Sequence, residues 1–241
     1  MRNRKNTRIL FLINVLCVLI GGLTRVLYCW KYPVPARDAY SYRNFIEEWI
    51  NTGTIPEGRT PPLGSYLMKL PAEHLHCDIL LGGTSVNVLL GVWTVLVLIK
   101  ISKEITHSNL IAAFTGIFAA THPFLVQHSC QAIRESSYLF FICVSILFFV
   151  HYFKSKYIYY LLLSSFFSAA AFLCRMEALE LFIIFGVITL LLKRNGLKKR
   201  IEDFGIWCTS YVGSFLLITY CIGVPLGYYK SYSMWWDRLL S

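Results

Sequence analysis

Long apolar stretches alternate with short polar connections along most of the chain. A helix needs roughly 20 mostly apolar residues to cross a bilayer, because backbone groups inside hydrocarbon must pair within the helix itself. Seven stretches approach that length, at residues 9–28, 79–99, 110–126, 137–152, 157–173, 178–192 and 204–226. The pattern therefore predicts an all-α fold, a polytopic membrane bundle of about seven transmembrane helices, with residues 1–241 as one transmembrane domain.

The longest connection, residues 30–78, has an amphipathic pattern of its own. From Ala39 to Asn51, apolar side chains recur at helical spacing opposite charged ones. A second apolar helical face follows Pro61-Pro62 and ends at Leu70, where we expect Pro71 to close the run. The loop is predicted to form two short interfacial helices over the outer ends of the spans, joined by a turn.

The distribution of basic residues predicts how the chain is oriented in the membrane. The chain has 23 Lys and Arg against 13 Asp and Glu, a net charge of +10, and the basic residues cluster in alternate connections. Those clusters are Arg2, Arg4, Lys5, Arg8; Lys100, Lys103; Lys154, Lys156; and Lys193, Arg194, Lys198, Lys199, Arg200. By the positive-inside rule the N-terminus is cytoplasmic and residues 30–78 are the first extracytoplasmic loop. Because the basic residues are divided among separate loops, nucleic acid is excluded as a partner. We expect a multi-pass protein of a bacterial inner membrane, with membrane lipid around it.

Charged residues also gather at the predicted outer face. They are Arg25, Arg37, Asp38, Arg134, Glu135, Arg175 and Glu177. Charges near hydrocarbon are costly and need partners or a water-filled cavity. Arginines can bind the phosphate of a lipid-linked donor, and a carboxylate can accept the proton of an incoming hydroxyl or amine. The other interpretation is that these residues form ion pairs that fix helix ends.

Several short motifs carry a family resemblance. Arg25, then Arg37-Asp38-Ala39-Tyr40 with Tyr42 and Pro61-Pro62-Leu63, are followed by Ile133-Arg134-Glu135 and Cys174-Arg175-Met176-Glu177. In this order the motifs resemble the N-terminal module of GT-C glycosyltransferases, the superfamily of protein O-mannosyltransferases and aminoarabinose transferases (glycosyltransferase family 39-like). Family members usually continue with further spans.

The resemblance implies a membrane glycosyltransferase that moves a sugar from a polyprenyl-phosphate donor to an unknown acceptor, which is a glycan, a lipid or a protein. It implies Asp38 as the base and Glu135 as a second acid that supports the acceptor or a metal. Arg25, Arg134 and Arg175 would bind the donor phosphate, with Arg37, Tyr40, Tyr42 and Glu177 in support.

The sequence departs from the family pattern at two positions. Ala39 stands where many relatives have a second acid, and Thr60 where many have His. His74 with His76, or His122 with His128, could supply imidazole to a divalent metal ion, or could be solvated loop residues. The alternative function is a non-catalytic polytopic protein: a transporter or lipid-carrier subunit, or an inactive relative.

Four cysteines lie at or near the predicted outer face, where oxidation can occur: Cys29, Cys77, Cys130 and Cys174. Four cysteines allow three disulfide pairings. The sequence leaves open whether any of them forms.

Overall fold

A computed structural model describes residues 2–56, 61–191, 196–225 and 228. In this part of the chain the regular structure is helical, which confirms the predicted all-α class. The helices are α1 (Arg2–Lys31), α2 (Arg37–Thr52), α3 (Pro62–Leu75), α4 (Ile79–Thr106), α5 (Asn109–Thr121), α6 (Pro123–Ser129), α7 (Glu135–Ser155), α8 (Ile158–Cys174), the short 3₁₀ helix η1 (Met176–Ala178), α9 (Leu179–Leu191) and α10 (Leu197–Cys221).

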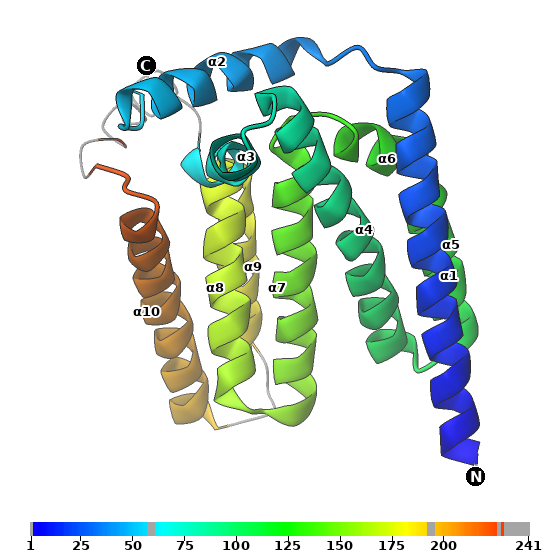
Figure 1. The fold of residues 1–241 in the computed structure, drawn as a ribbon. Helices are drawn as coiled ribbons and strands as arrows, with labels where there is room; N and C mark the ends of the chain where they lie inside the picture. Colours follow the sequence, from blue (N-terminus) through cyan, green and yellow to red (C-terminus); the bar gives the residue numbers. More distant parts are fainter. Residues whose placement is uncertain (1, 57–60, 192–195, 226–227, 229–241) are drawn as a thin grey trace, which may run out of the picture.

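Long helices run side by side, and two helices of the first loop lie across one end of them (Figure 1). We call this end, covered by α2 and α3, the roof end, and the opposite end, where the chain starts, the basal end. The predicted interfacial helices are thus present as helices. Their buried faces hold Ala39, Ile46 and Trp49 on α2 and Leu63 and Met68 on α3. The turn predicted between them falls partly on residues 57–60, outside the described residues.

The expectation that Pro71 closes the second interfacial helix is wrong. Helix α3 continues through Pro71 to Leu75, and His76 ends it in the left-handed region at φ 51°. Proline removes one backbone donor from a helix but does not prevent a further turn when neighbouring elements hold the segment. Here α3 packs between α2, α4 and α8, so its tertiary contacts maintain the helix beyond the proline.

The predicted number of seven spans is too high. Among the described residues, four helices are long and apolar enough to cross a membrane, namely α1, α4, α7 and α10. The pair α5 and α6 would make a fifth span, but it bends by 54° at its break. Helices α8 and α9 are apolar where expected, yet they have only 17 and 13 residues. The hydropathy pattern located the helices correctly. It overestimated how many of them are long enough to cross a membrane.

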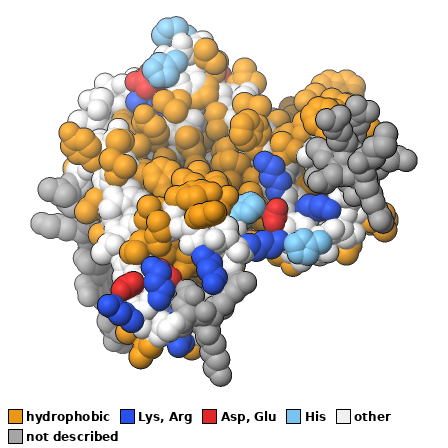
Figure 2. Space-filling view, turned by 90° about the horizontal axis from the view of Figure 1, so that it is seen from below, with side chains coloured by type: hydrophobic (Ala, Val, Ile, Leu, Met, Phe, Trp, Pro, Cys, Tyr) orange, Lys and Arg blue, Asp and Glu red, His pale blue; other side chains and the backbone are white. Residues whose placement is uncertain are grey.

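The basal end carries the basic connections. Figure 2 views the molecule from this end and shows Lys and Arg side chains gathered on it. Lys103 and Lys154 lie in the last turns of α4 and α7, and Lys198 to Arg200 lie at the start of α10. Large apolar side chains such as Phe11, Leu89 and Leu216 are exposed on α1, α4 and α10. Exposed apolar helix sides in this number are typical of a surface in contact with lipid, so the chain is a multi-pass membrane protein.

Candidate functional site

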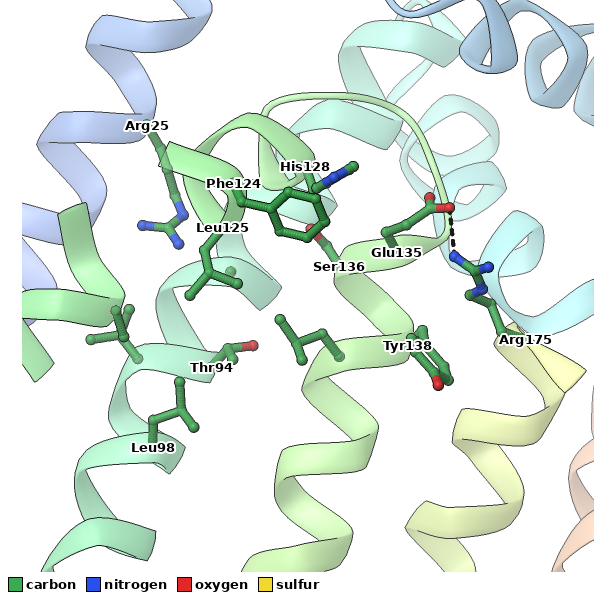
Figure 3. Close-up of a pocket in the computed structure, with 14 residues that line it drawn as sticks. Arg25, Thr94, Leu98, Phe124, Leu125, His128, Glu135, Ser136, Tyr138 and Arg175 are labelled. Carbon is green, nitrogen blue, oxygen red and sulfur yellow. Dashed lines mark hydrogen bonds and ion pairs between the residues drawn. The ribbon is translucent and has the colours of Figure 1, made fainter. Parts of the chain in front are cut away.

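A cavity of about 220 Å³ lies under the roof end, between α1, α4, α5, α6 and α7. Most of its wall is apolar, with Val95, Leu98, Leu125 and Leu139 among the lining residues. Its lining also includes two arginines, a histidine and a glutamate, namely Arg25, Arg175, His128 and Glu135. Arg25 enters from α1 on one side, and Glu135 and Arg175 lie on the opposite side (Figure 3).

Arg25 is a buried cation with only neutral partners. Its side chain is 1% exposed. Its Nε donates to Ser129 Oγ at 2.8 Å, and its Nη1 donates to the carbonyl oxygens of Gly21 at 2.9 Å and Ala120 at 3.5 Å. In the described part of the chain no carboxylate pairs with it. The cavity wall therefore carries an uncompensated positive charge.

The break between α5 and α6 creates this environment. Proline has no N–H and disfavours helical geometry in the residue before it, and His122, which precedes Pro123, is extended at φ −60° and ψ 121°. Pro123 then opens α6 at a position where a missing N–H costs nothing. The resulting bend brings Ser129 of α6 against Arg25 and places His128 at the cavity.

On the far side of the cavity, Arg175 bridges two carboxylates. Its Nη1 lies 3.0 Å from Glu135 Oε1 and its Nη2 lies 2.6 Å from Glu177 Oε1. The guanidinium also lies 5.5 Å from the centre of the Tyr138 ring. The hydrogen bond with Glu177 raises the pKa of Arg175, and the same bond lowers the pKa of Glu177, so the pair stays charged. Arg175 thereby joins the roof end of α8 to the start of α7.

A second group of predicted site residues lies beside this bridge, outside the cavity lining. The Arg134 guanidinium lies 6.0 Å from the centre of the Tyr42 ring. Burial raises the pKa of Tyr42 to about 12, and the charges of Arg134, Glu135, Asp38 and Arg175 all act on its hydroxyl. Asp38 is exposed on α2, one helical turn before Tyr42.

The structure thus brings most of the predicted residues into one region. Arg25, Glu135 and Arg175 line the cavity. Tyr42 lies next to it, with Arg134 over its ring and the charges of Arg134 and Asp38 acting on its hydroxyl. Arg37 and Tyr40 are exposed on α2 and do not line the cavity. The assigned roles of all these residues stay predictions.

Sequence reasoning missed two features of the cavity. It considered His128 as a metal ligand or as a solvated loop residue, although His128 lines the cavity together with Glu135. It also overlooked Ser129 and Gly91, which contact Arg25. The His122-Pro123 dipeptide inside an apolar stretch is the signal that would have indicated a bend and polar residues after it.

Three buried polar atoms of the cavity-lining residues have no hydrogen-bond partner: His128 Nδ1, Glu135 Oε2 and Arg175 Nε. Unsatisfied buried polar groups are costly, so such a cluster needs water or a polar ligand as its hydrogen-bond partner. The cluster does not fit a metal ion, however, because no three His, Cys, Asp or Glu side chains gather as a ligand set within the described ranges. We therefore assign no step to a metal.

Gly91 on α4 makes the approach of Arg25 and Ser129 possible. A methyl group there would lie 2.6 Å from Ser129 Cβ and 2.8 Å from Arg25 Nε. We expect Gly91→Ala to lower the free energy of unfolding by about 1–3 kcal/mol through overpacking. Gly213→Ala on α10 is the matched control, because nothing lies within 4 Å of its added methyl group. Thermal unfolding in detergent checks the pair, and equal midpoints for the two variants would contradict the close contact.

The geometry can be compared with known proteins. The sequence profile of the family described as dolichyl-phosphate-mannose-protein mannosyltransferase matches residues 59–222, about two thirds of the chain. This match includes Arg134, Glu135, Arg175 and Glu177, and it begins after Asp38. No curated protein matches the chain. The chain therefore belongs to the dolichyl-phosphate-mannose-protein mannosyltransferase family of GT-C-type membrane glycosyltransferases.

Proposed function

We propose that the protein transfers a sugar from a polyprenyl- or dolichyl-phosphate donor to an acceptor at the roof end. Asp38 would act as the base on the acceptor, and Arg25, Arg134 and Arg175 would bind the donor phosphate. The family match supports a lipid-linked sugar donor in general terms. The cavity supports the more specific assignment.

The single observation that carries this proposal is the unpaired charge of Arg25. A cation buried near hydrocarbon costs several kcal/mol when only neutral groups surround it. An anion in the cavity would remove that cost, and a phosphate diester offers oxygens that a guanidinium binds in its planar geometry. The apolar remainder of the wall suits the first carbons of a lipid tail.

The positions of Asp38 and Arg25 suggest how the acceptor enters. Asp38 is exposed on the roof helix α2, whereas Arg25 is buried on α1 in the bundle. A water-borne acceptor would therefore meet Asp38 while the donor reaches the cavity from the lipid. The acceptor oxygen then bonds to the anomeric carbon, its proton passes to Asp38, and the bond from that carbon to the phosphate oxygen breaks. Arg25 and Arg175 stabilise the lipid phosphate that leaves.

The charge distribution supports an extracytoplasmic roof end. Basic residues of three helices meet at the basal end, where α1 also starts, and the positive-inside rule assigns such an end to the cytoplasm. We propose a bacterial inner membrane as the host membrane and the cell envelope as the place of the acceptor. The sugar would then be delivered on the side where α2 and α3 lie.

Donor consumption tests the proposal. The purified full chain in lipid vesicles is incubated with radiolabelled polyprenyl- and dolichyl-phosphate sugars and an extract of envelope acceptors. We expect the label to leave the lipid fraction and the free lipid phosphate to accumulate. Binding of the donors without any turnover would favour the lipid-carrier alternative, and absence of both binding and turnover would refute the proposal.

A further inference from the structure

Two cysteines meet at the roof end of α1, outside the cavity just described. Cys130, the residue after α6, has its Sγ 3.2 Å from the carbonyl oxygen of Arg25. Cys29 lies one helical turn after Arg25 on α1, close enough to the Cys130 thiol to affect its pKa. Both cysteines line a second cavity of about 260 Å³, on the side of α1 that faces the start of α4.

The other two roof-end cysteines lie in different packing environments. Cys174 is fully buried at the end of α8, in an apolar cluster with Leu63 and Ile218. Cys77 lies next to Gly82 at the junction of α3 and α4, where an added methyl group would be 3.1 Å from its sulfur. Of the three pairings that four cysteines allow, the contacts therefore favour the one that contains Cys29 and Cys130.

We propose that Cys29 and Cys130 form a disulfide bond that fixes the roof end of α1 to the segment between α6 and α7. The two thiols lose two protons and two electrons, and a sulfur–sulfur bond forms. The oxidant is a dithiol–disulfide exchange partner or a small disulfide, which is reduced to its thiols. The proposal rests on the extracytoplasmic roof end inferred above, because that side of a membrane is oxidising.

The positions of the two residues indicate what the bond would do. Cys29 follows Arg25 by one helical turn, and Cys130 lies five positions before Glu135, at which α7 begins. A bond between them would hold the buried guanidinium of Arg25 at a fixed position relative to the start of α7. It would also close a loop of about 100 residues, and a loop of that length gives a large reduction in the freedom of the unfolded chain.

Access and reactivity differ between the two thiols. Cys29 is half-buried and Cys130 is buried, so Cys29 meets an oxidant first and Cys130 resolves the mixed disulfide. Burial raises the pKa of the Cys130 thiol to about 12. The thiolate is the reactive form, so bond closure is expected to be faster at higher pH.

Peptide mapping tests the bond without any activity assay. Cells are lysed in excess N-ethylmaleimide, and the full chain is purified without reductant, digested and analysed by mass spectrometry. We expect a linked peptide pair that contains Cys29 and Cys130. We also expect reduction to lower the apparent melting temperature by about 5 °C. Cys29→Ser should remove the link and most of that shift, while Cys221→Ser, a change at an exposed thiol of α10, should change neither.

Two outcomes would overturn the inference. One is alkylation of both thiols in the native chain, with no link even after prolonged exposure to oxidised glutathione at pH 9. The other is a link that joins Cys29 or Cys130 to Cys77 or Cys174. Cys29→Ser leaves Cys130 without its proposed partner, so maleimide labelling of Cys130 in this variant but not in the native chain would support the bond independently. Because the readout is a mass, a chain that turns over no donor can still show the bond, so failure of the two proposals is distinguishable.

Discussion

Arg25→Met is expected to abolish most donor turnover while leaving the protein as stable as before or more stable. Its guanidinium is 1% exposed and bonds only Ser129 and two carbonyl oxygens. Replacement of a buried charge by an apolar side chain of similar volume is often neutral or stabilising. Loss of a charge-assisted contact to the donor phosphate costs about 3 kcal/mol, which is about 100-fold in kcat/KM.

Measuring both stability and donor turnover distinguishes a functional arginine from a structural one. Thermal unfolding in detergent gives the stability, and label transfer from a lipid-phosphate sugar gives kcat/KM. Arg200→Met is the matched control, since Arg200 also donates to a helix-end carbonyl, that of Leu190 at 3.3 Å, but at the basal end. A loss of stability in Arg25→Met together with unchanged turnover of the remaining folded protein would show that Arg25 serves the fold alone.

Asp38→Asn is expected to lower kcat by about 10²–10⁴-fold, the usual contribution of a positioned general base, with the KM for the donor unchanged. Asparagine keeps the shape of the side chain and removes the group that accepts the proton. Because Asp38 is exposed on α2, the change should leave the unfolding midpoint within about 1 °C, as expected for a surface substitution. Single-turnover transfer of the labelled sugar measures the effect.

Two further variants define what the Asp38 result means. Glu47→Gln changes an exposed carboxylate on the same helix and should keep full activity. Glu135→Gln removes a cavity-lining carboxylate that pairs with Arg175 at 3.0 Å. If Glu135→Gln loses turnover and Asp38→Asn retains it, the base is Glu135, and the assignment made from the family resemblance is wrong.

The exposure of Asp38 and the burial of Arg25 have one consequence for the mechanism. The two residues lie on different helices, one on the roof and one within the bundle, so they can serve different substrates at the same time. Tyr42 is half-buried, and the charges of Asp38, Arg134 and Arg175 all act on it. A glycosyl transfer between a lipid-borne donor and a water-borne acceptor needs a site of this kind.

The sequence by itself determined the elements and their approximate placement. Hydropathy located every long helix, because an apolar run in a bilayer has no other way to satisfy its backbone groups. Helical periodicity located α2 and α3, and the alternation of basic connections separated the basal end from the roof end. Both signals are local, so a single sequence is sufficient to detect them.

Only the tertiary structure decided how these elements meet. Ser129 contacts Arg25 across 104 positions of the chain, and Arg175 bridges to Glu135 across 40. Sequence spacing placed Arg134 and Arg175 alike at the outer face, yet only Arg175 lines the cavity. The physical reason is that the direction of a side chain at a helix end depends on what packs against it. The continuation of α3 through Pro71 likewise depends on packing against α2, α4 and α8, which hydropathy does not describe.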